Sequence, residues 1–313
     1  MKAPNNHKSF FLYLLTTCML WSCDRKELSV HEELYTGTVL LSLDWQGATP
    51  THPTERVHVW GTHSSSGSQQ KISLDTLFLM AAGASARLPL LEAEYNIAVW
   101  HDAANISFDG THFHLSTDKD GHLNEPDAFH ACFDKLQVTA GQENNSAIRL
   151  YPYTRVLALS LHMDTQAEGR IETIRATLNG LASARKLSDR STNSKKSGSC
   201  CWELKRETAS DTRSAQEVTF ASKRRLLGIH TEEAQQLTLT LHYTNGEQES
   251  IQQDLTSALQ AFNTSEEETK IFTLSASIHF AGQATPSATI ENWKQGTETD
   301  LDAWNQTEKA IIN

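Results

Sequence analysis

The sequence predicts an all-β protein in which two immunoglobulin-like β-sandwich domains follow a secretion signal in tandem. Short runs in which apolar and polar residues alternate recur along the chain, and residues 237–243 are the clearest. Turn-forming residues separate these runs at regular spacing, and few segments have a helical period. Without the signal, the rest of the 313 residues is long enough for two ordinary domains.

The first element is a short apolar run at residues 10–20, preceded by Lys2 and Lys8. A positive start before an apolar run of fewer than about 20 residues is typical of a secretory signal peptide rather than a membrane-spanning helix. The run ends in a match to the bacterial lipoprotein cleavage box at Cys23. We therefore predict a signal peptide over residues 1–22 and a mature chain held by palmitate-type lipid on Cys23. Ordinary secretion, with Cys23 merely near the cut, is the alternative.

A charged, aperiodic stretch over residues 23–36 is predicted to tether the first sandwich, residues 37–145, to the membrane. The first sandwich contains five clear strand patterns, at residues 38–45, 56–60, 94–101, 111–115 and 129–138. Residues 64–70 are predicted to be a polar loop. A polar break at residues 141–146 sets the boundary to the second domain.

The second sandwich is predicted over residues 146–285. Its clear strand patterns lie at residues 155–161, 217–220, 237–243, 249–251 and 270–280. Residues 171–181 suit a strand or a helix, and residues 255–262 suggest one or two helical turns. We expect residues 184–199, which are polar and basic, to form a long exposed loop. Residues 286–313 read as a polar tail.

One turn has a specific prediction. Asn245 and Gly246 lie between two alternating runs, and both residue types tolerate positive φ. An Asn-Gly pair in this position predicts a β-hairpin with a type I′ turn.

Charge and cysteine content exclude several classes of protein. The net charge of −11 argues against nucleic acid, which requires a basic surface. Outside the signal and Cys23, three cysteines remain, and a bridge from Cys132 to Cys200 or to Cys201 is left open. An odd number of cysteines without paired zinc spacing predicts neither a disulfide scaffold nor a zinc domain.

His112 and His114 are the residues of the sequence that most invite a metal-binding interpretation. They are two residues apart, so a strand would present both on one face. They lack the spacing to further ligands that known metal motifs have, and we predict exposed strand histidines, no metal site and no cofactor. The sequence contains neither a nucleophile elbow nor a phosphate-binding loop, and we predict that the protein is not an enzyme.

Several short motifs carry a resemblance to a known family. They are Cys23 with the charged residues 24–28, Asp44-Trp45, Glu94-Tyr95-Asn96, Asn179-Gly180-Leu181-Ala182 and the hairpin at residues 237–246. Together they resemble the FimB-type fimbrial anchor and minor-subunit lipoproteins of Bacteroidales-like bacteria, and a sister family of uncharacterised lipoproteins. The resemblance spans most of the mature chain, although residues 188–201 do not fit its pattern. It implies two transthyretin-like sandwiches, a lipid anchor in the cell outer membrane, a place at the base of a type V pilus, and no cofactor.

Two functions from different classes follow. The first is a pilus anchor or minor subunit in cell adhesion, surface-exposed at the outer membrane, with fimbrial subunits as partners that join by β-strand addition. The alternative is a surface glycan-binding lipoprotein of a nutrient-uptake system, in which exposed tryptophans stack on sugar rings. Its candidate residues are Trp60, Trp202, Trp293 and Trp304. We expect Trp45 and Trp100 to fill the sandwich core instead. A purely structural envelope lipoprotein is a third reading.

Overall fold

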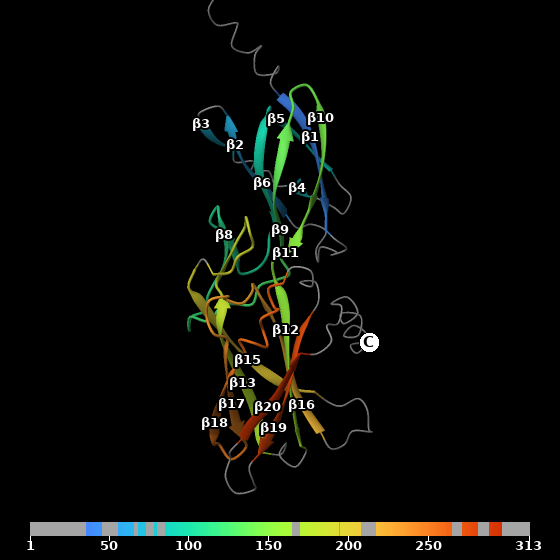
Figure 1. The fold of residues 1–313 in the computed structure, drawn as a ribbon. Coiled ribbons are helices and arrows are strands. Elements are labelled where there is room, and N and C mark those ends of the chain that lie inside the picture. The colour runs from blue at the N-terminus through green and yellow to red at the C-terminus, as the bar shows by residue number, and fades with distance from the viewer. Residues whose placement is uncertain are drawn as a thin grey trace, which may run out of the picture.

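The computed structural model describes residues 36–45, 56–65, 68–72, 78–79, 85–164, 170–193, 195–207, 217–264, 271–280 and 288–295. All regular elements in these residues are strands, which confirms the predicted all-β fold. The strands form four sheets in an elongated molecule (Figure 1). Cys23 and Trp304 lie outside the described residues. The described part contains no helix of the length and apolarity needed to cross a bilayer.

A three-stranded sheet at one end of the molecule has the order β10–β1–β5 (Figure 1). Its strands are β1 (Thr36–Asp44), β5 (Ser85–Leu91) and β10 (Glu143–Arg149). The central strand β1 pairs in parallel with β10 and antiparallel with β5. Val39 and Leu41 on β1 are fully buried, because alternate residues of a strand face the core.

A six-stranded sheet packs against this small sheet. Its strands are β2 (Arg56–Ser65), β3 (Ser68–Ile72), β4 (Phe78–Leu79), β6 (Ala93–His101), β9 (His130–Val138) and β11 (Tyr151–Pro152). The order is β11–β9–β6–β2–β3, with β4 also beside β2. Side chains from both sheets, among them Leu88, Tyr95, Val99 and Ile148, form one buried cluster between them, as in a sandwich.

An eight-stranded sheet forms the other end of the molecule, with the order β18–β17–β13–β15–β16–β12–β19–β20. Its strands are β12 (Arg155–Asp164), β13 (Ile171–Ala182), β15 (Ser197–Arg206), β16 (Glu217–Leu226), β17 (Gln236–Tyr243), β18 (Gln248–Asp254), β19 (Phe272–Phe280) and β20 (Ala288–Gln295). One large cluster of buried apolar side chains collects residues from seven of these strands. The ambiguous stretch at residues 171–181 is therefore a strand, and part of the expected polar tail forms β20.

A second three-stranded sheet covers the remaining face of the six-stranded sheet. It consists of β7 (Ile106–Phe108), β8 (His112–Leu115) and β14 (Ala184–Lys186), in the order β14–β8–β7. Phe113 on β8 and Leu187 after β14 are buried with Ala98 and Phe129 in a separate apolar cluster. This sheet joins segments that lie about 70 residues apart in the chain.

The prediction of a long exposed loop at residues 184–199 is wrong. Residues 184–186 pair with β8, and residues 197–199 belong to β15. Arg185, Leu187 and Thr192 are buried. Because the polar groups of this segment find partners in the fold, its hydrophilic composition does not keep it in solvent.

Two local predictions about loops also need correction, whereas the helical turn suggested at residues 255–262 is present. Residues 64–70 were expected to be a loop, but β2 and β3 extend through most of them as a hairpin. The polar break at residues 141–146 is largely strand β10, so the predicted boundary at residue 145 falls inside a strand, and the division into two domains stays a prediction. Residues 255–262 form consecutive hydrogen-bonded turns, with Leu259 N–H donating to the Leu255 carbonyl at 2.9 Å.

The predicted hairpin around Asn245 is confirmed, whereas the predicted type I′ turn is wrong. Strands β17 and β18 pair antiparallel on either side of the turn. Only Gly246 has positive φ there, at 87°, while a type I′ turn requires positive φ at Asn245 as well. Gly246 N–H donates to the Tyr243 carbonyl, and Tyr243 N–H donates to the Glu247 carbonyl. This pattern is a type I turn followed by a glycine in the left-handed region.

The three cysteines of the folded part, Cys132, Cys200 and Cys201, are free thiols. Burial raises the pKa of Cys132 to about 11 and that of Cys200 to about 12. Neither of the bridges that the sequence left open is formed.

Candidate functional site

The tryptophans predicted to stack on sugars do not share one face in the described residues. Trp202 on β15 is buried in the core of the eight-stranded sheet. Trp293 on β20 packs against the same core, and its Nε1 donates to Gln253 Oε1 at 3.4 Å. Trp60 lies on β2 of the six-stranded sheet, in a different cluster.

Trp60 is half-buried by the hairpin that follows β6. Its ring makes an edge contact with Phe108, with centroids 6.3 Å apart. Phe108 in turn contacts Trp100 and Phe113 at 4.6 and 4.8 Å between ring centroids. The ring of Trp60 therefore contributes to packing between two sheets, rather than to an open stacking surface with Trp202 and Trp293.

The edges of the sheets are the second place where a partner could bind, because an edge strand presents unpaired backbone groups. In the eight-stranded sheet, side chains connect the two edge strands to each other. The Glu249 carboxylate on β18 accepts the N–H of Ala288 on β20, at 3.0 and 3.2 Å to its two oxygens. The bond from Trp293 to Gln253 links the same two strands. Both edges of this sheet are thus engaged within the protein.

The edge strand β5 carries a proline that limits further pairing. Thr38 on β1 donates its N–H to the Gln142 carbonyl, towards β10. Pro89 on β5 lies opposite Thr38. Because the backbone groups of Thr38 point to β10, the backbone groups of Pro89 point away from β1, towards the open edge. Because proline has no N–H, this edge lacks a donor at Pro89, a feature common on natural edge strands.

The opposite edge strand, β10, has no such interruption. The Gln142 carbonyl accepts from Thr38, and Leu150 N–H donates to the Asp44 carbonyl at 2.9 Å, so the even-numbered backbone groups point to β1. The alternate residues, whose backbone groups point away from β1, are Glu143, Asn145, Ala147 and Arg149. No strand in the described part of the chain pairs with this side of β10.

The side chains of these four residues are exposed, and Glu143 forms an ion pair with Arg87 on β5 at 3.1 Å. Each outward residue offers one N–H donor and one C=O acceptor, repeated every second residue. Another extended chain can match this spacing. The β10 edge is therefore the candidate site of protein–protein contact.

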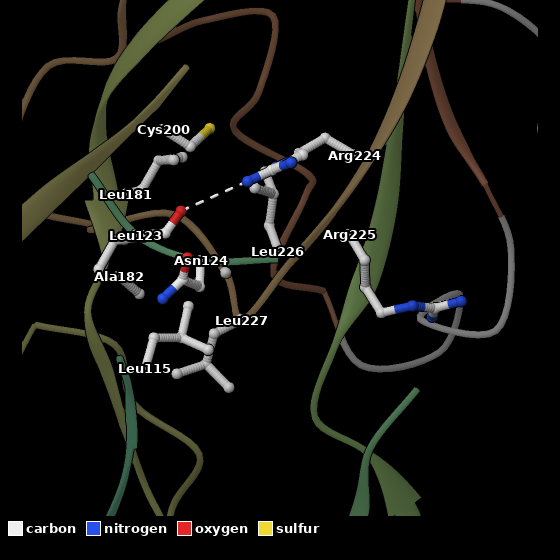
Figure 2. Close-up of a pocket in the computed structure, with 11 residues that line it drawn as sticks. Leu115, Leu123, Asn124, Leu181, Ala182, Cys200, Arg224, Arg225, Leu226 and Leu227 are labelled. Atoms are coloured by element: carbon white, nitrogen blue, oxygen red, sulfur yellow. Dashed lines mark hydrogen bonds between the residues drawn. The ribbon is translucent and has the colours of Figure 1, made fainter. Parts of the chain in front are cut away.

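A small cavity and a larger groove lie within the described part of the molecule. Figure 2 shows the one where β8, β15 and β16 meet, enclosed mostly by leucines, with Arg224 donating to the Leu123 carbonyl. Its volume is about 10 Å³, enough for one water molecule. A groove of about 420 Å³ lies over β12 and β16, lined by small residues with Lys205, Glu207 and Lys223.

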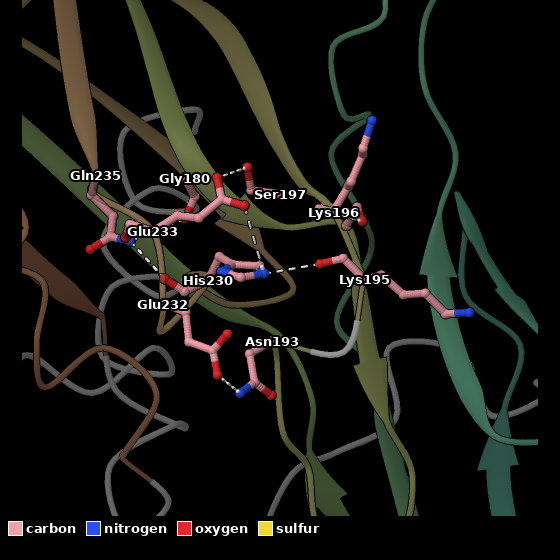
Figure 3. A network of polar contacts seen from close by, with 10 residues as sticks. Gly180, Asn193, Lys195, Lys196, Ser197, His230, Glu232, Glu233 and Gln235 are labelled. Atoms are coloured by element: carbon pink, nitrogen blue, oxygen red, sulfur yellow. Dashed lines mark hydrogen bonds and ion pairs between the residues drawn. The ribbon is translucent and has the colours of Figure 1, made fainter.

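A polar network near residue 230 resembles a catalytic triad in its residue types only (Figure 3). His230 Nε2 donates to the Lys195 carbonyl at 2.9 Å and lies 3.9 Å from Glu233 Oε1. The Ser197 hydroxyl donates to Glu233 rather than to His230, so the histidine does not take its proton. Asn193 donates to Glu232 at 2.6 Å, and this network connects Asn193, Lys195 and Ser197 to the turn that precedes β17.

No family model matches this chain. No curated protein is similar to it in sequence. Among solved structures, the fimbrial anchor protein Mfa2 from Porphyromonas gingivalis is similar, with a TM-score of 0.55 and 14% identity. The match covers 83% of this chain and 96% of that one. A candidate adhesin from Bacteroides ovatus has a TM-score of 0.51 and 10% identity, over 84% of this chain and 96% of its own.

A second candidate adhesin from that species has a TM-score of 0.50 and 12% identity, over 74% and 86% of the two chains. At these identities the likeness establishes the fold. The resemblance to fimbrial anchor lipoproteins is confirmed at that level.

Proposed function

We propose that this protein is a non-catalytic, lipid-anchored protein of the cell outer membrane that serves a type V pilus as anchor or minor subunit. The observation that carries the proposal is the fold shared with a fimbrial anchor protein over 83% of this chain and 96% of that one. A fold hosts many functions, so the features that favour this one are sought in the chain itself.

The first such feature is the order of elements at the N-terminus. The lipoprotein box at Cys23 and the charged tether directly precede β1, which begins at Thr36. Strand β1 belongs to the sheet at one end of the elongated molecule (Figure 1). Lipid on Cys23 would thus attach the chain to the membrane close to its first sheet, which also contains β10.

The second feature is the outward side of β10. Its backbone donors and acceptors are paired to no described strand, whereas the edges of the eight-stranded sheet are connected through Glu249 and Gln253. We propose that a fimbrial subunit adds a strand along β10. Backbone hydrogen bonds would supply affinity, and alternating side chains of the added strand would set the register.

The glycan-binding alternative has less support. It requires tryptophans on one open face, and Trp60, Trp202 and Trp293 lie in separate packed environments. Trp202 would have to leave the core to reach a sugar.

The test compares wild-type cells with a Cys23→Ala variant, and uses Cys18→Ala as the matched control because Cys18 lies inside the predicted signal. Cells are labelled with palmitate and fractionated, and the protein is then immunoprecipitated. We expect label and outer-membrane retention to be lost only in Cys23→Ala, and fimbrial subunits to co-purify with wild type and with Cys18→Ala. Retained label in Cys23→Ala would overturn the anchor, and label without any co-purifying subunit would overturn the pilus role.

A further inference from the structure

A compact group of metal-ligand side chains lies on the hairpin between β7 and β8. Asp109 is in the turn, and His112 and His114 lie on β8. Phe113 between them is fully buried, so the two histidines share the opposite face of the strand. Strands β7 and β14 pair with β8 on either side, which fixes the backbone that carries both rings.

The three side chains are close enough to share one ion. One donor atom from each lies within 4.8 Å of the others. His114 Nε2 is 2.7 Å from Asp109 Oδ2. Ligands at 2.0–2.2 Å around a tetrahedral ion are separated by roughly 3.3 Å, so small side-chain movements would suffice.

The turn itself holds Asp109 in position. Its Oδ1 accepts hydrogen bonds from the backbone N–H groups of Thr111 and His112 and from the Thr111 hydroxyl, at 2.7–2.8 Å. The carboxylate is therefore oriented before any ion arrives.

His112 is held in a form that can accept a metal. The Thr111 hydroxyl gives its proton to Asp109, so at 2.8 Å it accepts the Nδ1 proton of His112. Nε2 then carries a lone pair, and this atom is buried without a hydrogen-bond partner among the described residues. Neutral imidazole is the form that ligates metals.

Surrounding charges restrict the kind of ion. Lys186 pairs in register with His112, and its Nζ forms an ion pair with Asp189 at 2.8 Å. Lys195 also adds positive charge near His112. A site with one carboxylate and two imidazoles beside lysines is unsuited to calcium or magnesium, which prefer several oxygen ligands. Imidazole nitrogens favour zinc, copper and nickel.

We propose that Asp109, His112 and His114 bind one divalent transition-metal ion of the zinc class, with an open fourth position for water. Binding would replace the hydrogen bond between His114 Nε2 and Asp109 Oδ2. The ion would tie the turn to β8 and stabilise the sheet that β14 completes.

The test is calorimetric titration of the purified full-length protein in detergent with Zn²⁺, together with visible absorption of the Co²⁺ form. We expect one ion per chain and tetrahedral Co²⁺ bands. His112→Ala and His114→Ala should each lower affinity at least about tenfold. His122→Ala is the matched control, because His122 is on a neighbouring turn and bonds to Ser199 instead.

Circular dichroism and thermal melts establish that each variant is folded, and His114→Gln replaces His114→Ala if the latter unfolds. If both histidine variants bound Zn²⁺ with the affinity and stoichiometry of wild type, the proposed site would be wrong. A thiolate-to-Co²⁺ charge-transfer band would also overturn it, since it would assign the ion to the free cysteines.

Discussion

Arg185 donates from Nη1 to the carbonyl oxygen of Tyr153 at 2.9 Å, and its guanidinium lies over the ring of the same residue, 5.1 Å from the centroid. It also donates to the carbonyls of Arg190 and Leu227, at 3.0 and 3.4 Å. The Tyr153 hydroxyl donates to the Leu187 carbonyl at 2.9 Å. One buried cation thus joins β14 to the chain just before β12 and just after β16.

Replacing Arg185 by methionine should destabilise the protein by about 2–4 kcal/mol. The change keeps an apolar stem but leaves three carbonyls without their donor, and a buried acceptor without a partner is costly. Urea unfolding monitored by tryptophan fluorescence measures the free energy. Arg175→Met on β13 is the control, because Arg175 is exposed, and it should change stability by less than about 0.5 kcal/mol. Equal effects of the two variants would contradict the assignment.

His130 should make the fold sensitive to acid. His101 Nδ1 donates to the Asp102 carbonyl, so its Nε2 accepts the N–H of His130 at 2.9 Å. Burial lowers the pKa of His130 to about 4, and nearby His101 and Arg225 contribute. Between about pH 6.5 and 4 the unfolded chain binds a proton at this residue that the folded chain does not. Stability should therefore fall as pH decreases through that window, by about 1–3 kcal/mol from this residue.

Urea titrations at pH 7.5, 6, 5 and 4 are the measurement, on wild type and His130→Gln. Removing the titrating ring should flatten the acid side of the stability curve, whereas His242→Gln on β17 should leave its slope as in wild type. A wild-type slope in His130→Gln would show that other groups cause the loss.

The alternation of apolar and polar residues predicts those strands in which every second side chain is buried. In β17, Leu237, Leu239 and Leu241 alternate with threonines, and all three leucines are fully buried. The same rule misses β10, because Ile148 is the only buried residue of that strand. Its pairing with β1 is parallel and spans about 100 residues of sequence, so nothing local signals it.

The burial of Arg185 and Thr192 could not be predicted from the sequence for a related reason. Arg185 and Thr192 are polar, and a polar residue is usually exposed. Their burial depends on carbonyls supplied by distant segments, such as that of Leu227 for Arg185. The sequence indicates only part of the proposed metal site, because His112 and His114 are two residues apart on one strand. The turn that brings Asp109 to them became apparent only from its hydrogen bonds.

Ala147→Pro should abolish strand addition at β10 and leave the fold intact. The N–H of Ala147 points away from β1, so a proline there removes an outward donor and no bond of the β1–β10 ladder. We expect stability within about 1 kcal/mol of wild type and at least a tenfold loss of co-purifying fimbrial subunits. Ala147→Thr, which keeps the N–H and a β-favouring side chain, is the control and should bind normally. Ser146→Pro removes an N–H that faces β1 and should instead unfold the sheet. Normal subunit recovery with a folded Ala147→Pro variant would move the contact away from the β10 edge.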